Sequence, residues 1–171
     1  MGENSLEMLR QRGSEVLARR GAGPERRDTL PESAEDEKSC LAFGYLRGMG
    51  DQGRSLEFRF SQGNRKAFPY SWLGPTDYNP SVGLLLKFVG DQVYLVFIEG
   101  SNLNVLVNDG MSLYERGILR HRITWVREMT RREIEEAGEG EVTVERIRTT
   151  SYRPDEQPKG VEWLKAFQDQ L

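Results

Sequence analysis

The stretch LLLKFVGDQVYLVFI, residues 84 to 98, predicts a short β-hairpin that is apolar on both faces. Gly90-Asp91 suits a tight turn with glycine in the first turn position. A strand that is apolar on both sides has to be covered on both sides. We therefore expect the hairpin to be central in its sheet, with further structure packed on each face.

Two segments carry helical patterns that would supply this cover. After Gly100, apolar residues recur at the three-to-four spacing typical of one helix face, namely Leu103, Leu106, Val107, Met111, Tyr114 and Ile118. Asn108-Asp109-Gly110 falls inside this pattern, so two turns joined by a loop are an alternative to one continuous helix. Pro158 precedes a second helical pattern, with Val161, Leu164, Phe167 and Leu171. We expect both segments to be structural.

Further strands are predicted on either side of the hairpin. In residues 55–61, Leu56, Phe58 and Phe60 alternate with charged residues, which is the period of a half-buried strand. The other predicted strands cover residues 40–47, 65–68, 121–128 and 142–152, the last of them as a polar edge strand. In residues 121–128, the alternation predicts that Trp125 shares the core-facing side with Ile123.

Two connections have recognisable chemistry. Thr130-Arg131-Arg132-Glu133 matches the capping-box pattern and predicts a short helix that ends at Gly138. Residues 70–81 are rich in Pro, Gly, Asp and Asn and are predicted to be a loop held by aromatic side chains.

The domain organisation follows from these patterns. Residues 1–20 are predicted to be a short amphipathic helix or a frayed tail, and residues 21–39 a disordered linker, because they hold one large apolar residue, Leu30. Residues 40–171 form the expected domain, of the α+β class. Its sheet is predicted to be small and antiparallel, with barrel closure as an open alternative and helices at its flank.

The composition of the 171 residues limits the functional classes. No apolar run approaches the ~20 residues that span a bilayer, so we expect no membrane span. One cysteine, Cys40, and one histidine, His121, exclude an internal disulfide and a four-ligand zinc site of the usual kind. These features favour a cytoplasmic location, and we expect no cofactor. The net charge of −3 argues against wholesale binding to a polyanion.

Two motifs suggest enzymes but lack their context. Residues 48–53 match the glycine pattern G-x-G-x-x-G of dinucleotide sites, yet a strand follows them where that fold needs a helix. They are explained more simply as a hairpin connection. Cys40 and His121 would be the members of any Cys-His nucleophilic pair, but a buried structural cysteine is the commoner role. We therefore assign no catalytic, cofactor or metal residue.

The candidate interaction residues are arginines and aromatics. Arginines interleaved with aromatics can bind phosphates and stack on unpaired bases, and this signal is carried by Arg116, Arg120, His121, Arg122, Trp125, Arg127, Arg131 and Arg132. Glu133, Glu135 and Glu136 follow as local partners, which favours a salt-bridged edge over an RNA surface. Tyr70 and Trp72 could line a ligand pocket or close one end of the fold.

Three phrases also carry a resemblance, namely FPYSWL at residues 68–73, GSNL at residues 100–103 and RHRITWVRE at residues 120–128. Together they resemble a group of bacterial conserved proteins, small β-rich domains without an assigned activity. The resemblance spans residues 41 to 137 and implies no catalytic or binding residue. In general layout the strand order is also similar to Sm-like or SH3-like small barrels.

We expect a non-enzymatic module that binds another protein or self-associates, with the edge strand of residues 142–152 as one candidate surface. RNA binding through residues 116–132 is the alternative. A small enzyme or ligand-binding domain is the third class, although no residue constellation nominates a reaction.

Overall fold

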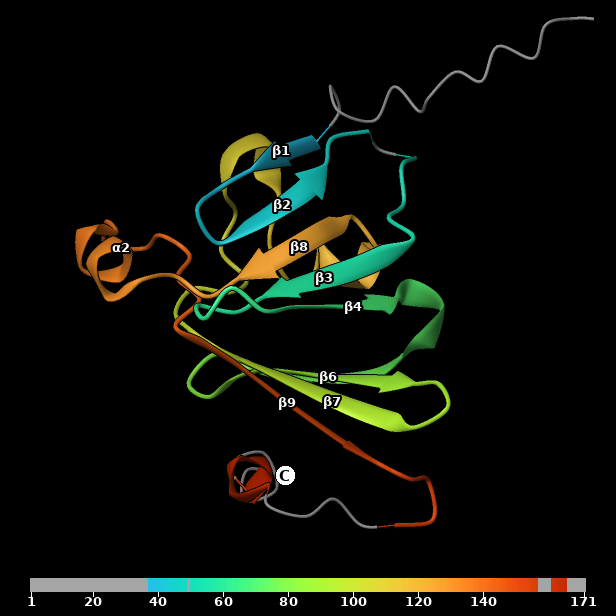
Figure 1. The fold of residues 1–171 in the computed structure, drawn as a ribbon. Coiled ribbons are helices and arrows are strands. Elements are labelled where there is room, and N and C mark those ends of the chain that lie inside the picture. The colour runs from blue at the N-terminus through green and yellow to red at the C-terminus, as the bar shows by residue number, and fades with distance from the viewer. Residues whose placement is uncertain (1–36, 49, 157–160, 166–171) are drawn as a thin grey trace, which may run out of the picture. The chain divides into compact units, whose positions relative to one another are not determined.

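Two β-sheets make up the fold of the protein (Figure 1). The computed structural model describes residues 37–48, 50–156 and 161–165. Sheet A has five strands in the order β1 (Glu37–Ser39), β2 (Phe43–Leu46), β8 (Ile123–Arg127), β3 (Ser55–Arg59) and β4 (Arg65–Pro69). Its neighbours are antiparallel except β3 and β8, which run parallel.

Sheet B has four antiparallel strands in the order β5 (Leu73–Asn79), β6 (Gly83–Val89), β7 (Val93–Glu99) and β9 (Arg146–Tyr152). A 3₁₀ turn, η1 (Tyr70–Trp72), carries the chain from β4 of sheet A into β5 of sheet B. The remaining described elements are three more 3₁₀ turns and one short helix, namely η2 (Asn108–Gly110), η3 (Ile118–Arg120), α2 (Arg131–Glu136) and η4 (Glu162–Leu164).

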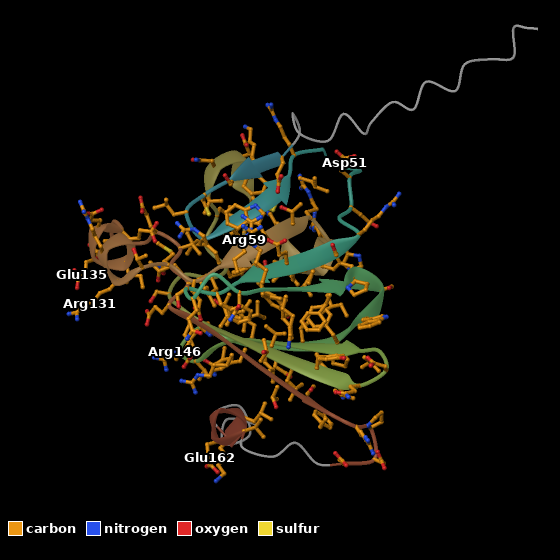
Figure 2. All side chains as sticks on the ribbon, viewed as in Figure 1. Asp51, Arg59, Arg131, Glu135, Arg146 and Glu162 are labelled. Atoms are coloured by element: carbon orange, nitrogen blue, oxygen red, sulfur yellow. The ribbon has the colours of Figure 1, made fainter. Side chains whose placement is uncertain are left out.

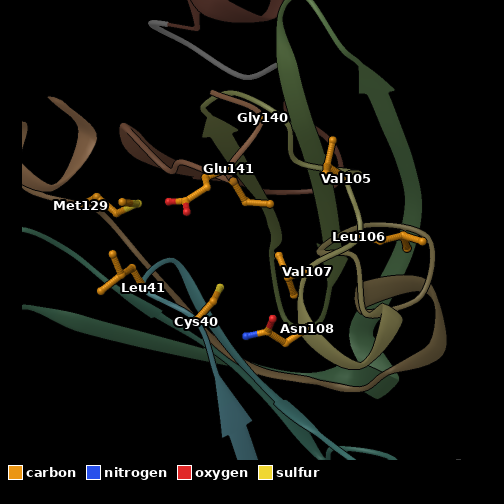
Figure 3. Close-up of a pocket in the computed structure, with 10 residues that line it drawn as sticks. Cys40, Leu41, Val105, Leu106, Val107, Asn108, Met129, Gly140 and Glu141 are labelled. Carbon is orange, nitrogen blue, oxygen red and sulfur yellow. The ribbon is translucent and has the colours of Figure 1, made fainter. Parts of the chain in front are cut away.

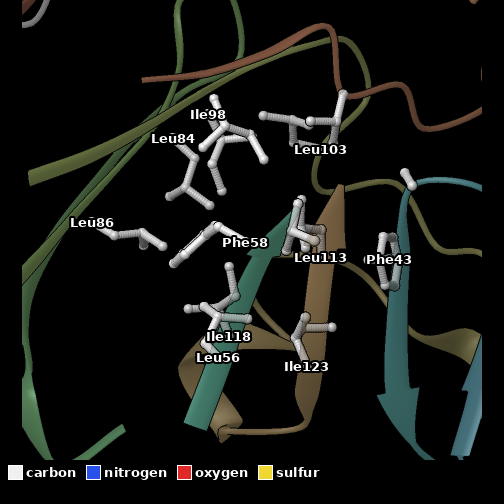
Figure 4. Packing of buried hydrophobic residues seen from close by; sticks show 14 of the residues in the cluster. Phe43, Leu56, Phe58, Leu84, Leu86, Ile98, Leu103, Leu113, Ile118 and Ile123 are labelled. Carbon is white, nitrogen blue, oxygen red and sulfur yellow. The ribbon is translucent and has the colours of Figure 1, made fainter. Parts of the chain in front are cut away.

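The core lies between the inner faces of the two sheets (Figure 4). Phe58 of β3 and Phe68 of β4 both contact Phe88 of β6, with ring centroids 6.2 Å and 4.6 Å away. The first pair meets edge to face and the second is stacked, which are favoured aromatic geometries. These three rings join sheet A to sheet B.

The hairpin of residues 84–98 has the predicted central place. β6 and β7 are the two inner strands of sheet B, and their alternate residues face opposite ways. Leu84, Leu86 and Phe88 point into the core between the sheets. Leu85, on the opposite face, belongs to a second apolar cluster. Both faces are covered, as expected.

The fold class is mostly β, with one short described helix, so the expected α+β architecture is wrong in its helices. The single antiparallel sheet is wrong too, because there are two sheets and sheet A contains the parallel pair β3 and β8. Barrel closure is also wrong, because the described strands form two separate sheets. The helix expected from Leu103 to Ile118 is absent: this connection holds only η2 and η3. Its apolar residues recur at helical spacing although no helix forms, because the irregular chain places some of them in the core at intervals. Leu103 and Ile118 are buried there, whereas Leu106 is exposed.

Backbone conformation explains why no helix forms in this connection. Asn102, Asp109 and His121 have φ values of 57°, 60° and 55°, and Gly110 has a φ of 68°. These left-handed residues interrupt any right-handed helix. The Asn108-Asp109-Gly110 sequence therefore acts as a break.

Three strand assignments also differ from the prediction. β1 lies inside the stretch expected to be a linker, and β5 lies inside the expected loop. Both are edge strands, where the pairing partner supplies what the local sequence lacks. The final strand begins at Arg146, four residues later than residue 142, and forms the predicted edge of sheet B.

A bulge moves Trp125 off the core side of β8. Phe43 and Gly44 of β2 pair with Val126 and Trp125, but Tyr45 pairs with Ile123, so the register shifts by one residue. Ile123 and Val126 are consequently both buried, and Trp125 is only half-buried. A bulge turns successive side chains to new directions, which simple alternation does not anticipate.

The predicted capping box is confirmed in α2. The Thr130 hydroxyl accepts a hydrogen bond from the Glu133 amide, and the Glu133 carboxylate accepts one from the Thr130 amide. Arg131 and Glu135 form an ion pair on the exposed side of this helix (Figure 2). The predicted N-terminal helix, most of the linker and the last turns of the C-terminal helix lie outside the described residues.

Candidate interaction surface

An apolar pocket of about 360 Å³ lies beside the turn between β1 and β2 (Figure 3). Three separate chain segments and one further residue form its walls: Cys40 and Leu41, residues 105–108, residues 140–142, and Met129. We call this the Leu106 pocket. No local pattern in the sequence indicates it, because its walls meet only in the folded chain.

The rim of the Leu106 pocket exposes large apolar side chains. Leu41, Val105 and Leu106 retain 53%, 43% and 54% of their accessible surface. Among the described residues, five large hydrophobic side chains are exposed to this degree, and three of them line this one pocket. Single exposed apolar residues need no explanation, but a cluster around a hollow is typical of an interaction site.

Backbone hydrogen bonds fix two walls of the pocket to each other. The Ser101 amide donates to the Thr143 carbonyl over 3.2 Å, and the Thr143 amide donates to the Ser101 carbonyl over 3.0 Å. The Asn102 side chain donates to the Glu141 carbonyl over 3.0 Å. Gly100 makes this approach feasible, since a Cβ there would stand 2.0 Å from the Thr143 carbonyl oxygen.

Side-chain contacts hold residues 105–108, one wall of the pocket, in place. Lys38 of β1 forms an ion pair of 2.6 Å with Asp109, which anchors residues 105–109 beside the β1–β2 turn. The hydrogen bond from Lys38 lowers the pKa of Asp109 more than burial raises it, so the carboxylate stays charged. Tyr45 donates to the Asn108 carbonyl over 3.1 Å. The pocket therefore has well-held walls with exposed apolar groups on top.

The polar groups at the Leu106 pocket are few. Asn108 and Glu141 are its polar lining residues, and Cys40 is a half-buried thiol in the wall. Within the described parts of the chain, no ion pair occupies Glu141 or the nearby exposed Glu139. The pocket therefore combines an apolar floor with one unpaired negative edge.

The structure disperses the arginines singled out in the sequence. Arg122 donates three hydrogen bonds to the carbonyls of Leu46 and Arg47, and Arg127 is paired with Glu133 through both terminal nitrogens. Arg116 donates to the Gly110 carbonyl. Arg131 and Arg132 each pair with a glutamate four residues on. Arg120 is the exposed member that has no such partner among the described residues.

The aromatic candidates support the fold at one end. Tyr70 is buried, its hydroxyl donates to the Ile123 carbonyl over 2.8 Å, and burial raises its pKa. His121 stacks on the Tyr70 ring with centroids 4.5 Å apart. Trp72 stacks with Tyr94 at 6.2 Å. Tyr70 and Trp72 line neither the Leu106 pocket nor the polar hollow at the start of β9.

The two enzyme-like motifs have structural explanations. The Gly53 amide donates to the His121 carbonyl over 2.6 Å, and a Cβ at Gly53 would stand 3.3 Å from that oxygen, so this glycine allows a close chain crossing. Cys40 lies at the Leu106 pocket, whereas His121 lies against Tyr70, and the structure shows no contact between them.

A second hollow, of about 460 Å³, lies between the β3–β4 turn and β9 and is polar. Two of its three charged groups already have partners: Glu128 accepts the amides of Ser61 and Ile147, and Arg148 pairs with Glu99, whereas Arg146 forms no ion pair with a described residue. In the described residues, no three His, Cys, Asp or Glu side chains gather where a metal ion would be held. None of the described helices is long and apolar enough to cross a membrane.

Comparison with known proteins adds no further assignment, since no family model, curated protein or solved structure matches the chain. The described part of the chain is a small β-rich domain.

Proposed function

We propose that this protein is a non-enzymatic interaction module that captures an apolar segment of a partner protein in the Leu106 pocket. The convergence of Leu41, Val105 and Leu106 on one hollow carries this proposal. Interfaces bury a few apolar anchors in well-packed pockets and surround them with a polar rim.

The lining favours a protein segment over a small molecule. Small-molecule pockets enclose most of the ligand and place several polar groups to orient it. Here the polar lining is Asn108 and Glu141, and three of the apolar lining residues are largely exposed to solvent. A small ligand inside the hollow would leave those three exposed, whereas a segment lying across the rim would cover them.

The negative charge beside the Leu106 pocket indicates which charge the partner segment should carry. Glu139 and Glu141 are exposed at one side of the pocket, and no described basic residue pairs with them. A partner segment with two or three apolar anchors and one Lys or Arg would complement both features. The charge pair at an exposed rim would contribute more to specificity and association rate than to affinity.

Selection from a random peptide library displayed on phage tests this proposal. Selected peptides are expected to share apolar anchors next to a basic residue. Leu106→Asp is expected to weaken their binding at least about tenfold, since losing one good hydrophobic anchor costs more than about 1.4 kcal/mol. Glu141→Lys should weaken binding less and mainly at low salt.

Leu119→Asp is the matched control for Leu106→Asp. Leu119 is the same residue type, is 47% exposed and does not line the pocket. Equal loss of binding in both variants, or selected peptides that bind Leu106→Asp as well as the original chain, would rule out the pocket as the binding site.

Self-association along β9 is a separate form of the same functional class. The seven residues of β9 form an edge of sheet B, and edges can pair with another strand. The Glu128 carboxylate already accepts the Ile147 amide at the start of β9, which shortens the part open to pairing. Light scattering of the purified chain measures this: a constant monomer mass up to high concentration contradicts self-association.

RNA binding is the second candidate, and three exposed arginines favour it. Arg47, Arg54 and Arg120 form no ion pair among the described residues. Contacts of the residues next to Arg120 bring the three together. The Arg122 side chain donates to the Arg47 carbonyl. The Tyr70 ring stacks on His121, and the Tyr70 amide donates to the Arg54 carbonyl.

A triple variant, Arg47→Glu, Arg54→Glu and Arg120→Glu, tests this candidate with fluorescent single-stranded RNA. Loss of three phosphate contacts should reduce the slope of log affinity against log salt by about 2. Arg122 is left unchanged because its hydrogen bonds support the backbone. Binding that is absent, or insensitive to salt and to the triple variant, ends the RNA candidate.

Within this proposal, the resemblance to bacterial β-rich proteins supports a bacterial origin and transfers no residue role, and the single cysteine supports a cytoplasmic location. A small enzyme remains the third class, and no described constellation of side chains nominates its reaction.

A further inference from the structure

The outer face of sheet B, which points away from sheet A, is apolar and yet buried. Leu85 of β6 and Val93, Leu95 and Phe97 of β7 lie on this face, because their neighbours in each strand point into the core. They are between 2% and 8% exposed. We call these four residues the outer patch.

The described side chains packed on the outer patch include one from the far end of the chain. They are Val82, Tyr152 and Leu164. Val82 precedes β6 and Tyr152 ends β9, so both belong to the surroundings of the sheet itself. Leu164, in η4, is the one of the three that approaches from outside the sheet.

We propose that the outer patch is a docking surface for residues 161–165 of the same chain, which cover it as a detachable strap. The segment has the composition for this role. Val161, Leu164, Phe167 and Leu171 recur at three-to-four spacing, and Leu164 is already seated on the patch. Glu162, labelled in Figure 2, and Lys165 flank Leu164, are exposed and pair with each other at 2.7 Å.

A polar tether precedes the strap. The sequence RPDEQPKG, residues 153–160, links Tyr152 to Val161 and contains no large apolar residue. Arg153, Pro154, Asp155 and Glu156 are exposed. The docking therefore depends on the apolar contacts of the strap itself, and elements with few buried contacts open at lower free energy than the core.

The short tether favours the chain's own segment over that of a second copy. Eight linking residues have a root-mean-square reach of about 16 Å, and short tethers produce effective concentrations in the millimolar range. At micromolar protein, docking within one chain is favoured by about a thousandfold. When the strap opens, the outer patch becomes an apolar sheet face available for association.

Site-specific crosslinking in the full chain tests the occupant directly. A diazirine amino acid at position 164 is expected to crosslink to peptides from residues 85–97 on illumination. Mixing chains labelled with ¹⁴N and ¹⁵N before illumination distinguishes docking within one chain from docking between two copies. A crosslink within one chain joins peptides of the same label. Crosslinks between labels, or only to peptides outside sheet B, would overturn the proposal.

Leu164→Glu in the full chain tests the consequence. It is expected to release the strap, to raise the fluorescence of an apolar dye several-fold and to produce concentration-dependent association in light scattering. Lys165→Glu introduces the same residue one position along, on the exposed side, and should do neither. Indistinguishable behaviour of the two variants contradicts the strap, and circular dichroism establishes that both chains retain their sheets.

Discussion

The Glu133 side chain links two neighbouring elements of the fold. Its carboxylate accepts hydrogen bonds from both terminal nitrogens of Arg127 and from the amide and hydroxyl of Thr130. The Arg127 hydrogen bonds, followed by those of Thr130, lower the pKa of Glu133 to about 2. The interaction therefore joins the end of β8 to the first turn of α2 in its charged form.

This pKa sets the direction of an acid-stability prediction. A carboxyl whose pKa is lowered by folding stabilises the protein above its ordinary pKa of 4.5 and loses that contribution as the pH falls toward 2. Glu133→Gln retains a side chain that can complete the capping box but lacks the charge. We expect the variant to be less stable than the original chain at pH 7 and equally stable near pH 2, as measured by urea unfolding.

Glu135→Gln provides the control at the same helix. Glu135 pairs with Arg131, and both side chains are more than 60% exposed, so the variant should change stability little at any pH. A Glu133→Gln effect that is the same at pH 7 and pH 2 would contradict the charge-based explanation.

At the scale of elements, the connection between β7 and β8 takes its shape from close chain crossings. Gly117 lies where three other groups meet: a Cβ there would stand 2.4 Å and 2.5 Å from the carbonyl oxygens of Ser112 and Leu113 and 2.5 Å from the Ile123 side chain. The Ile118 amide also donates to Leu113, and the Arg122 amide donates to Gly117. The backbone has no room to shift.

Gly117→Ala is therefore expected to destabilise the protein by about 1–3 kcal/mol, which is the usual cost of overpacking a core. Gly50→Ala is the control, because a Cβ at Gly50 meets nothing within 4 Å. That substitution should be neutral or slightly stabilising, since it restricts the unfolded chain. The midpoint temperatures of thermal unfolding measure the stability of the two variants. Equal midpoints would show that the chain around Gly117 can move aside to accommodate a Cβ.

The elements that could be predicted from the sequence are those whose structure depends on residues close together in the chain. The hairpin β6–β7, strand β3 and the capping box of α2 each follow from residues that lie within a few positions of one another. β5 could not be recognised, because Pro75 and Asn79 are typical of loops and the strand forms by pairing with β6. The apolar pattern from Leu103 to Ile118 predicts a helix that does not form, because a loop that buries one side chain every few residues has the same spacing.

The candidate site was less predictable than the fold for a related reason. The helical spacing places Leu106 on a buried helix face, so it does not predict that this side chain is exposed. Its pocket combines residues 40–41, 105–108 and 140–142, and their proximity depends on the tertiary structure. Arginines are conspicuous in a sequence, but Arg122 and Arg127 turned out to hold the fold together.

At the scale of the whole molecule, Glu128 joins the two sheets outside their shared core. It follows β8 of sheet A, and its two oxygens accept the Ser61 amide in the β3–β4 turn and the Ile147 amide in β9 of sheet B, over 2.6 Å and 2.7 Å. Burial raises the pKa of Glu128, but the hydrogen bonds from the Ile147 and Ser61 amides lower it further, so the carboxylate is charged in the folded protein. This contribution is present above its ordinary pKa and is lost as the pH falls below it.

Glu128→Gln retains one acceptor oxygen in place of two, so one of the two backbone amides must lose its partner. A lost hydrogen bond to a charged group costs about 1.5–3 kcal/mol. We expect faster hydrogen exchange at Ser61 or Ile147, while exchange in α2 stays unchanged. Glu145→Gln is the control, because Glu145 is exposed near the same strand and no described residue pairs with its side chain. If exchange at both amides were unchanged, the apolar core between Phe58, Phe68 and Phe88 would suffice to couple the sheets, and Glu128 would be dispensable to their register.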